Sequence, residues 1–386
     1  MNLFIDKTTV ARSLPLFGLD PLARLLRTAD RLPTRPPMVV QDGDAARPLG
    51  TRLREALAQG PDLLVLDGSA VIDPRLMGHL LSRGQPGVVL GGEGAERAAA
   101  LCLRPEHAAA VPPDAASVLE VADALLAAGA LPQLDLDGMG LFVKNLRREV
   151  QPWLFTVPDD ASRRARERWM FWQNYKGSTD ALTRWVYPPI VWPLVRLSAR
   201  FRVHPNWITL VSVVLAFACV PYFAAGEFLV GFLMAYAMTI LDSVDGKVAR
   251  LTLTDSAIGN VMDHGLDIVH PPLWYLAWAW GLGARSVEDP AMLAALWLLG
   301  FYVADRIVLG IAKARFRRGL HAMTSLDGAV RTWIARRNIN MVILCVALLV
   351  GEGTAGMVAC AAWQGLTLAW HTARTAQLWG RPATAA

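Results

Sequence analysis

Four aspartates lie inside or beside an apolar stretch in the second half of the chain: Asp242, Asp245, Asp263 and Asp267. The first two are spaced i, i+3 and the last two i, i+4, so each pair shares one face if the stretch is helical. Ionisable side chains inside membrane segments are costly and usually functional. Because four neighbouring carboxylates repel one another unless cations neutralise them, this spacing indicates a metal site.

Small and cationic residues stand at fixed positions between these acids: Gly246, Ala249, Arg250 and Gly259. The full pattern, D-x2-D-G-x2-A-R-x8-G-x3-D-x3-D, resembles that of the CDP-alcohol phosphotransferases, membrane enzymes of phospholipid synthesis. The preceding HPNWIT, with Pro205, Asn206 and Thr209, resembles the stretch that opens the first span of that family.

The resemblance implies attack by an alcohol on the β-phosphorus of a CDP-linked donor, with CMP as the leaving group. It assigns two divalent cations, Mg²⁺ or Mn²⁺, to Asp242, Asp245, Asp263 and Asp267, and it makes Asp267 the general base. Such cations neutralise the charge of the pyrophosphate. Gly246 would let the donor approach the backbone, and Arg250 would reach a phosphate. Ala249 and Gly259 would let two helices pack closely.

Further cations are candidates for the acceptor pocket. Asp305 and Arg306 lie inside a predicted span, where they form either a mutual ion pair or part of the pocket. Arg336 and Arg337 are either anchors at the membrane surface or a cationic pocket for an anionic acceptor such as an inositol phosphate. His264 and His270 flank the aspartates, but oxygen ligands suit Mg²⁺ better, so both histidines are expected to pack or hydrogen-bond.

The composition indicates a protein that is partly membrane-embedded. Of its 386 residues 54% are hydrophobic, and the mean hydropathy is +0.33, but the apolar residues concentrate after residue 200. Six apolar segments predict six spans. These are Trp207–Ala225, Phe228–Leu251, Ser256–Leu282, Met292–Ala312, Asn340–Val350 and Thr354–Trp370.

The basic residues set the expected orientation. Ten fall on the side of the N-terminus and one, Arg285, on the other. The ten are Lys247, Arg250, Lys313, Arg315, Arg317, Arg318, Arg331, Arg336, Arg337 and Arg374. An integral protein of an inner or plasma membrane with both termini in the cytoplasm is therefore expected, without a cleaved signal peptide. The net charge of +5 is modest, and its placement argues against nucleic acid as a partner.

The first half of the chain predicts an α/β domain over residues 1–150, because short apolar runs alternate with helical patterns. The runs at 38–40, 63–67 and 87–91 predict buried strands, and 74–82 and 115–128 predict helices. Asp67 ends a strand, where it either contributes to a ligand site or makes an ordinary turn. Residues 151–203 then form a linker, whose Arg-rich segment 159–173 is either an amphipathic helix on the membrane surface or a solvated helix.

The first half also resembles the nucleotidyltransferase-like domain of particular family members. Those members join an inositol-phosphate cytidylyltransferase to a di-myo-inositol-phosphate-phosphate synthase. The resemblance lies in LFGLDPLARLLRTADRL, LLVLDGSAVIDPRLMGHLL and the juxtamembrane YKGSTDALTRWVYPPI. A Gly-rich, cationic nucleotide-binding loop is missing near the N-terminus, where the first glycine is Gly18. We therefore expect a nucleotidyltransferase fold that has lost cytidylyl transfer.

The expected architecture is a six-helix membrane bundle over residues 204–380, preceded by this cytoplasmic α/β domain. Two substrate arrangements stay open: a lipid donor such as CDP-diacylglycerol with a soluble inositol phosphate, or a CDP-inositol donor with a lipid or soluble alcohol. The rival functions are a membrane scaffold or binding protein and a divalent-cation transporter. The resemblance also implies a homodimer. Four scattered cysteines without CxxC spacing predict free thiols: Cys102, Cys219, Cys345 and Cys360.

Overall fold

The computed structural model describes residues 1–380, except residues 34, 59, 137–138, 144–145 and 256 and the side chains of Ala11 and residues 257–268. The chain divides into two compact units. The first comprises Met1–Val143, Glu149–Asn174 and Leu251–Leu253. The second comprises Lys144–Arg148, Tyr175–Arg250 and Thr254–Ala386. A division near residue 174 assigns the Arg-rich segment of the predicted linker to the first unit.

A five-stranded sheet in the order β2-β1-β3-β6-β5 forms the centre of the first unit. Strands β2 and β3 pair with β1 in parallel, whereas β6 pairs antiparallel with both β3 and β5. The strands are β1 (Asn2–Asp6), β2 (Val39–Asp42), β3 (Leu63–Asp67), β5 (Gly87–Gly91) and β6 (Ala98–Leu103). The register places Asp6 beside both Asp42 and Asp67, so three parallel strands end in aspartate along one edge of the sheet.

The predicted strands at 63–67 and 87–91 are present with the expected bounds. The prediction of a buried strand at 38–40 is wrong about burial, because Met38 is 51% exposed and β2 lies at an edge of the sheet. An edge strand has a neighbour on one side only and is less covered. Strands β1 and β6 were not predicted, although β1 is central and its Leu3, Phe4 and Ile5 are fully buried.

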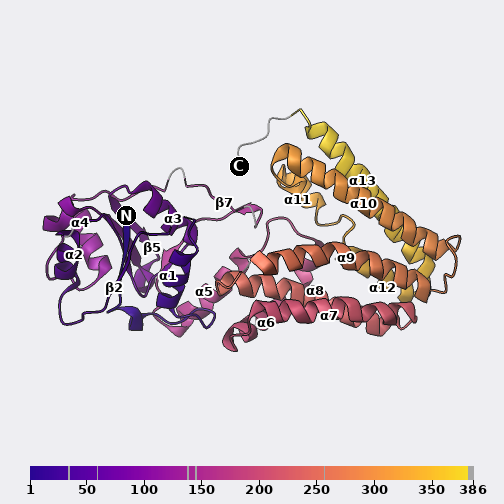
Figure 1. The fold of residues 1–386 in the computed structure, drawn as a ribbon, viewed down its shortest axis with the longest axis horizontal. Helices are drawn as coiled ribbons and strands as arrows, with labels where there is room; N and C mark the ends of the chain where they lie inside the picture. The colour runs from indigo at the N-terminus through magenta and orange to yellow at the C-terminus, as the bar shows by residue number, and fades with distance from the viewer. Residues whose placement is uncertain (34, 59, 137–138, 144–145, 256, 381–386) are drawn as a thin grey trace. The chain divides into compact units, whose positions relative to one another are not determined.

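Helices cover both faces of the sheet, as the alternating pattern predicts (Figure 1). Helices α1 (Pro21–Asp30) and α3 (Pro74–Arg83) contribute to one buried apolar cluster, and α2 (Leu49–Ala58) and α4 (Val118–Ala127) to another. Local sequence signals fix their ends. The carboxylate of Asp73 accepts a hydrogen bond from the Arg75 amide at the start of α3, and Gly84 ends α3 with φ +58°.

Helix α5 (Asp160–Gln173) completes this unit and corresponds to the Arg-rich segment. One side of it packs within the first unit, since the buried Glu167 accepts a hydrogen bond from the Phe17 amide (2.9 Å) and Arg166 donates to Glu96. That its exposed side lies on a membrane surface stays a prediction. The remaining short strands are β4 (Val71–Ile72), which pairs with β9 (Leu154–Phe155), and β7 (Phe142–Val143) and β8 (Arg148–Glu149). Single 3₁₀ turns occur at Val10–Arg12, Gly94–Glu96 and Pro105–Ala110.

The second unit is helical. A π-helical turn, η4 (Leu182–Val186), and α6 (Pro188–Arg200) precede the predicted spans. The long helices are α7 (Pro205–Ala224), α8 (Phe228–Leu251), α9 (Ala257–Gly281), α10 (Pro290–Phe316), α12 (Arg337–Leu349) and α13 (Gly353–Leu378). Between α10 and α12 lie the 3₁₀ turn η5 (Leu320–Ala322) and α11 (Ser325–Val330). Each of the six predicted spans thus corresponds to one helix.

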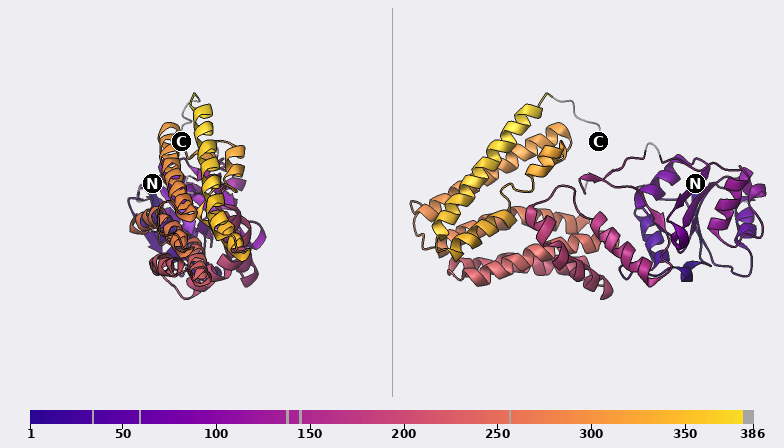
Figure 2. Two further views of the ribbon diagram at one scale, coloured as in Figure 1. Left: turned by 90° about the vertical axis from the view of Figure 1, so that its right-hand side faces the viewer. Right: turned by 180° about the vertical axis from the view of Figure 1, so that it is seen from behind.

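Small residues let these helices approach closely. A Cβ atom at Gly281 would lie 1.9 Å from the Phe223 carbonyl oxygen, so the end of α9 packs directly against the end of α7. Helices α10 and α13 run side by side in both orientations shown (Figure 2), and a Cβ at Gly365 would lie 3.1 Å from the Phe301 ring. In the apolar core of the unit, the Trp278 ring of α9 packs against Phe223 of α7 and Phe228 of α8.

Three helices among the described residues are long and apolar enough to cross a membrane: α7, α8 and α10. Their outer faces carry exposed apolar side chains, for example Leu229 (72% exposed) and Trp207 (65%), as expected for surfaces that contact lipid. Helix α12 is apolar but shorter. That α9, α12 and α13 also cross the membrane stays a prediction. All four cysteines are free thiols, as predicted.

Candidate functional site

Helix α8 positions the first two aspartates of the motif on one face near its C-terminal end. Asp245 is buried, with 6% of its surface exposed. Its Oδ2 accepts a hydrogen bond from the Thr209 hydroxyl of α7 (2.6 Å), and its Oδ1 accepts one from the Gly246 amide (2.5 Å). Within the part of the chain that the structure describes, Asp245 forms no ion pair with a cationic side chain.

A buried carboxylate without a cationic partner is unfavourable unless a cation reaches it. The donor set around Asp245 therefore fits a divalent cation: carboxylate oxygens are the ligands that Mg²⁺ and Mn²⁺ prefer, and two of them lie one helical turn apart on α8. The side chains of Asp263 and Asp267, the other two predicted ligands, lie outside the described residues, as do those of Gly259 and His264. Helix α9, which carries them, is present.

Asp242 has a cationic neighbour from a distant part of the sequence. Arg337, the first residue of α12, donates from Nη2 to Asp242 Oδ2 (3.1 Å), and its Nη1 lies 2.8 Å from His270 Nε2 on α9. His270 is buried against the Trp274 ring, so it packs and hydrogen-bonds as predicted. Arg337 therefore joins α8, α9 and α12 at the aspartates. This role was missed, because nothing in the local sequence distinguishes Arg337 from an anchor at the membrane surface.

The small residues and the arginine of the motif also lie at this end of α8. A Cβ atom at Gly246 would lie 3.3 Å from Nη1 of Arg250, so the guanidinium folds back over the glycine and a larger side chain would displace it. Ala249 accepts a hydrogen bond from the Thr254 amide (2.8 Å), which closes the end of the helix. The Arg250 guanidinium, the second one near the aspartates after that of Arg337, thus lies beside Gly246.

The three predicted residues at the start of α7 differ in whether they contact the aspartates. The Thr209 hydroxyl lies 2.6 Å from Asp245 Oδ2 and 3.2 Å from the Pro205 carbonyl oxygen, so its single proton is directed mainly to the nearer Asp245. Asn206 is exposed, and its amide donates to the side chain of His204, the N-cap of α7. Of the three predicted residues, Thr209 alone contacts a motif aspartate among the described side chains.

The mutual ion pair of Asp305 and Arg306, one of the two alternatives for these residues, is not formed. Asp305 is buried and pairs with Nδ1 of His371 on α13 (2.5 Å), whereas the Arg306 guanidinium lies 4.8 Å from the centre of the Tyr302 ring. Adjacent residues on a helix point about 100° apart, so their charged groups meet poorly. The partner of Asp305 was missed because 66 residues separate it from His371.

Arg336 lies beside an acid that the sequence did not single out. Its Nη1 is 3.7 Å from Asp180 Oδ2, and Asn338 donates to Asp180 Oδ1 (3.1 Å). Burial alone would raise the pKa of Asp180, but the charge of Arg336 and hydrogen bonds from Asn338 and Thr183 outweigh it and lower that pKa. Arg336, which precedes α12, and Arg337, its first residue, thus bind two different acids, Asp180 and Asp242.

A second group of carboxylates lies in the first unit, at the ends of β1, β2 and β3. The buried Arg52 of α2 donates to Asp6 (3.0 Å) and lies 3.3 Å from Asp42. Asp67 accepts hydrogen bonds from the Thr9 hydroxyl and from the amide and hydroxyl of Ser69. The Ser69 contacts make a local turn that supports the simpler alternative for Asp67.

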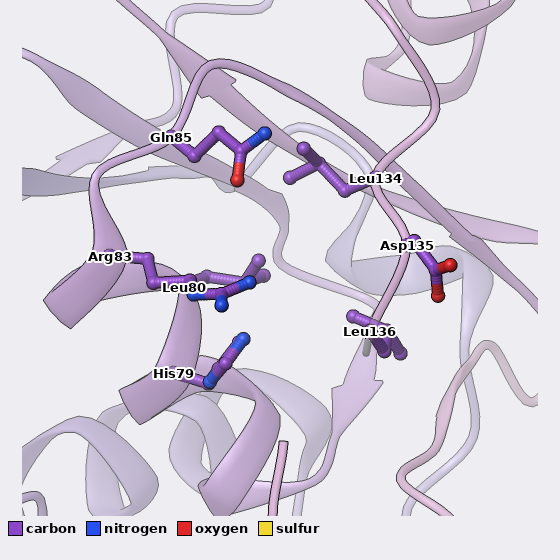
Figure 3. Close-up of a pocket in the computed structure, with 7 residues that line it drawn as sticks. All are labelled: His79, Leu80, Arg83, Gln85, Leu134, Asp135 and Leu136. Atoms are coloured by element: carbon purple, nitrogen blue, oxygen red, sulfur yellow. The ribbon is translucent and has the colours of Figure 1, made fainter. Parts of the chain in front are cut away.

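The first unit also contains a pocket between the C-terminal part of α3 and the segment that follows α4 (Figure 3). His79 and Arg83 project from α3, and Leu134 and Leu136 line the opposite side. Burial and the charge of Arg83 lower the pKa of His79. None of the residues singled out in the sequence lines this pocket.

One family model matches a part of the chain. Residues 202–373 match the model of the family described as CDP-alcohol phosphatidyltransferase. No curated protein matches the chain. Among solved structures, the chain is similar to Mycobacterium tuberculosis phosphatidylinositol phosphate synthase (PgsA1). The form with CDP-DAG bound has 17% identity, a TM-score of 0.41 and coverage of 51% of this chain and 98% of that chain. The form with manganese and citrate has 18% identity, a TM-score of 0.40 and coverage of 50% and 91%.

Proposed function

Because residues 202–373 match the CDP-alcohol phosphatidyltransferase family, we propose that the chain is a membrane CDP-alcohol phosphotransferase. It moves a substituted phosphate from a CDP-linked donor to an alcohol and releases CMP. The observation that carries this proposal is the buried Asp245. It is held by Thr209, shares a helix face with Asp242, and has no cationic side chain paired to it among the described residues.

Different residues of the chain have different roles in the proposed reaction. Asp242 and Asp245, together with Asp263 and Asp267, would hold Mg²⁺ or Mn²⁺; when bound, these cations neutralise the pyrophosphate and polarise its phosphorus. Thr209 fixes the orientation of the Asp245 carboxylate, and Arg337 does the same for Asp242. Arg250 lies within reach of a donor that approaches Gly246. Asp267 takes the proton of the acceptor hydroxyl.

The finer parts of the proposal follow from the sequence. We infer six spans with both termini in the cytoplasm, a homodimer, and an acceptor pocket that uses Arg306 or Arg336. An inositol phosphate as acceptor, with a lipid donor, is favoured over a CDP-inositol donor, because Arg336 and Arg337 lie next to one another and Arg337 contacts Asp242. A scaffold would have no need of a buried carboxylate without a cationic partner.

The first unit is proposed to keep a nucleotidyltransferase-like fold without cytidylyl transfer. Two of the carboxylates at the ends of its parallel strands already have hydrogen-bond or ion-pair partners within the unit. Asp6 is bound by Arg52 and Thr8, and Asp67 by Thr9 and Ser69. A nucleotide or its metal would have to displace these contacts. The test is pyrophosphate release from CTP and inositol phosphate, and robust release would refute the loss of activity.

The experiment for the main proposal is CMP release by the purified full-length protein. Mg²⁺ or Mn²⁺ is supplied with a panel of donors, including CDP-diacylglycerol and CDP-inositol, and several alcohols. We expect CMP from at least one pair of substrates, its loss in Asp267→Asn, and its retention in Glu288→Gln, an exposed carboxylate changed in the same way. The proposal fails if no donor yields CMP, or if Asp267→Asn keeps full activity.

A further inference from the structure

The first unit includes three residues from a distant part of the sequence, Leu251–Leu253. They are the last residue of α8 and the start of the turn that leads to α9. Leu251 is 1% exposed, so the end of α8 is buried. The turn lies between the two halves of the aspartate motif, with Asp245 on the helix before it and Asp263 on the helix after it. Its conformation therefore affects how the two halves are joined.

The backbone of this turn is strained. The Thr254 amide donates to the Ala249 carbonyl oxygen (2.8 Å), and Leu253 has φ +54°, the arrangement of a Schellman helix end. Glycine is the usual residue at such a position, because a side chain strains the backbone there. A leucine adopts this conformation only where neighbouring groups hold it. The turn therefore requires contacts beyond its own hydrogen bond.

Two arginines of α1 make such contacts. Arg24 Nη2 donates to the Leu251 carbonyl oxygen (2.8 Å), and Arg27 Nη1 donates to the Thr252 carbonyl oxygen (2.9 Å). Carbonyl groups in the last turn of a helix have no partner within it, and the helix dipole gives this end a partial negative charge. Arg24 and Arg27 are three residues apart and share one face of α1. Their guanidinium groups therefore cap the C-terminal end of α8.

Arg24 also bonds to a second strained turn. It is 4% exposed, and its Nη2 donates to the Leu16 carbonyl oxygen (3.1 Å). Leu16 and Leu19 exchange backbone hydrogen bonds (3.0 and 3.2 Å) around Phe17, whose φ is +52°. The Phe17 amide in turn donates to the buried carboxylate of Glu167 on α5 (2.9 Å). A single nitrogen atom of Arg24 thus bonds to both turns.

The charge of Arg24 makes these acceptors important. Burial, followed by the charge of Arg27, lowers the pKa of Arg24 to about 10, whereas the charge of Glu167 raises it. The guanidinium is therefore protonated at physiological pH. Its Nε is buried and has no hydrogen-bond partner among the described residues. Because a buried cation is unfavourable unless it is hydrogen-bonded, Arg24 and the end of α8 stabilise each other.

The position of this turn matters for the proposed chemistry. Arg250 directly precedes Leu251, and Asp245 lies on the same helix. Mg²⁺ requires near-ideal octahedral geometry, so ligands from two helices must be held at fixed distances. A displacement of ~1 Å can lower a rate about 100-fold. A cap that fixes the end of α8 therefore affects the rate through the aspartates, without contact with a substrate.

We propose that Arg24 and Arg27 are positioning residues for the phosphotransfer, because they fix the turn between α8 and α9 and thereby the spacing of the two pairs of aspartates. This rests on the proposed function, since it assigns those aspartates to the metal ions of that reaction. The two arginines act through the carbonyl groups of Leu251 and Thr252. The first unit thus contributes to the transfer, although it is proposed to have lost cytidylyl transfer.

The first experiment measures the turn itself, without substrate or metal. Hydrogen exchange of the Thr254 amide is followed in the full-length protein in detergent. Exchange should be faster by at least ~10-fold in Arg24→Gln, which loses hydrogen bonds from a buried charged group. It should be faster by about 3-fold in Arg27→Gln, whose exposed cation acts on the helix end. Arg27→Lys retains a cationic donor and should exchange as the wild type does.

Arg35→Gln is the matched control. Arg35 is exposed and donates to the carbonyl oxygen of Asp30, the last residue of α1, so its loss removes the same kind of bond at another helix end. This variant should leave the exchange of Thr254 unchanged. If Arg24→Gln fails to fold, Arg27→Gln decides, because Arg27 is exposed. Equal exchange in Arg27→Gln and the wild type would overturn the proposal.

The second experiment separates positioning from a purely structural role. Mn²⁺ affinity is measured by electron paramagnetic resonance, and the kinetics of CMP release are measured in the same variants. In Arg27→Gln, we expect Mn²⁺ affinity and kcat to be lower by about 3-fold, with the KM for donor and acceptor unchanged. Arg27→Lys should restore both. An unchanged Mn²⁺ affinity in Arg27→Gln, even with faster exchange of the turn, would show a purely structural role and overturn the proposal.

The Mn²⁺ measurement needs no substrate, so it distinguishes the two proposals. If the wild type releases no CMP from any donor, the proposed function fails. A loss of Mn²⁺ affinity in Arg27→Gln that Arg27→Lys restores would still support the positioning role.

Discussion

Two groups of carboxylates, one in each unit, are stabilised in different ways. At the ends of β1 and β2, the carboxylates share a buried guanidinium, since Arg52 is 3.0 Å from Asp6 and 3.3 Å from Asp42. In α8, Asp245 is almost as buried as Asp6, but its partners among the described residues are a hydroxyl and an amide. Each carboxylate of the first group lies beside the Arg52 guanidinium, whereas Asp245 has no cationic partner among the described residues.

We therefore interpret the carboxylates of the first unit as a structural cluster and those of α8 as a ligand-binding site. A fully paired buried charge stabilises one arrangement of the chain and has no capacity for another cation. A buried carboxylate that is only hydrogen-bonded destabilises the free protein and favours binding of a cation. Removal of a charge should therefore have opposite effects on stability in the two units.

The largest expected effect on stability is that of Arg52→Ala. It leaves Asp6 buried without a cation, which we expect to destabilise the first unit by about 3–5 kcal/mol. Hydrogen exchange of β1, β2 and β3 measures this loss. Arg47→Ala, which removes an exposed ion pair with Glu55, is the control and should change protection little. Unaltered protection in Arg52→Ala would show that the cluster is not needed to hold the sheet.

Asp245→Asn should behave in the opposite way. The change removes a buried charge and keeps the shape of the side chain, so the unfolding temperature in detergent should be equal to or above that of the wild type. CMP release should fall by at least ~100-fold, as expected when a group that stabilises transition-state charge is lost. A variant that is both unstable and inactive would place Asp245 in the same class as Asp6.

Thr209→Val tests a smaller contribution to the same carboxylate. Loss of the 2.6 Å hydrogen bond leaves Asp245 less well oriented, and CMP release should fall by about 10-fold, the effect of one hydrogen bond to a charged group. Thr372→Val, which removes a hydroxyl bonded to the carbonyl of its own helix, is the matched control. An equal loss in both variants would point to a general effect of threonine removal on helix packing.

The smallest expected effect is a pH dependence from Asp180. Its pKa is lowered in the folded protein, because Arg336, Asn338 and Thr183 together outweigh burial. The contribution to stability is thus present above the ordinary pKa of about 3.9 and is lost as pH falls through the lower, folded value. The unfolding temperature of the wild type should drop below about pH 4 more steeply than that of Asp180→Asn. Parallel curves would exclude this contribution.

Local patterns predicted many of the elements. The run LLVLD gives β3, GVVLG gives β5, and each apolar segment after residue 200 gives one long helix. Strand β6 was missed because AAALCL is rich in alanine, which has low β propensity. Strand β1 has the same length as β3 and β5, and only its pairing with β2 and β3 shows that it belongs to the sheet. The edge position of β2 depends on strand order, which a single segment does not encode.

The candidate site was predictable where its residues are close in sequence and unpredictable where they are not. The spacing of Asp242 and Asp245 on one helix face follows from the helical period alone. The contact of Arg337 with Asp242 spans 95 residues, and that of Asp305 with His371 spans 66. Such pairs arise from the packing of α12 against α8 and of α10 against α13, for which local periodicity carries no signal.

The proposed chemistry requires that a divalent cation binds the Asp245 carboxylate. Titration of the full-length protein with Mn²⁺, followed by electron paramagnetic resonance of the free ion, measures this binding independently of any substrate. We predict that the wild type binds Mn²⁺, that Asp245→Asn loses most of this affinity, and that Glu288→Gln keeps it. Equal Mn²⁺ binding by the wild type and Asp245→Asn would contradict the account.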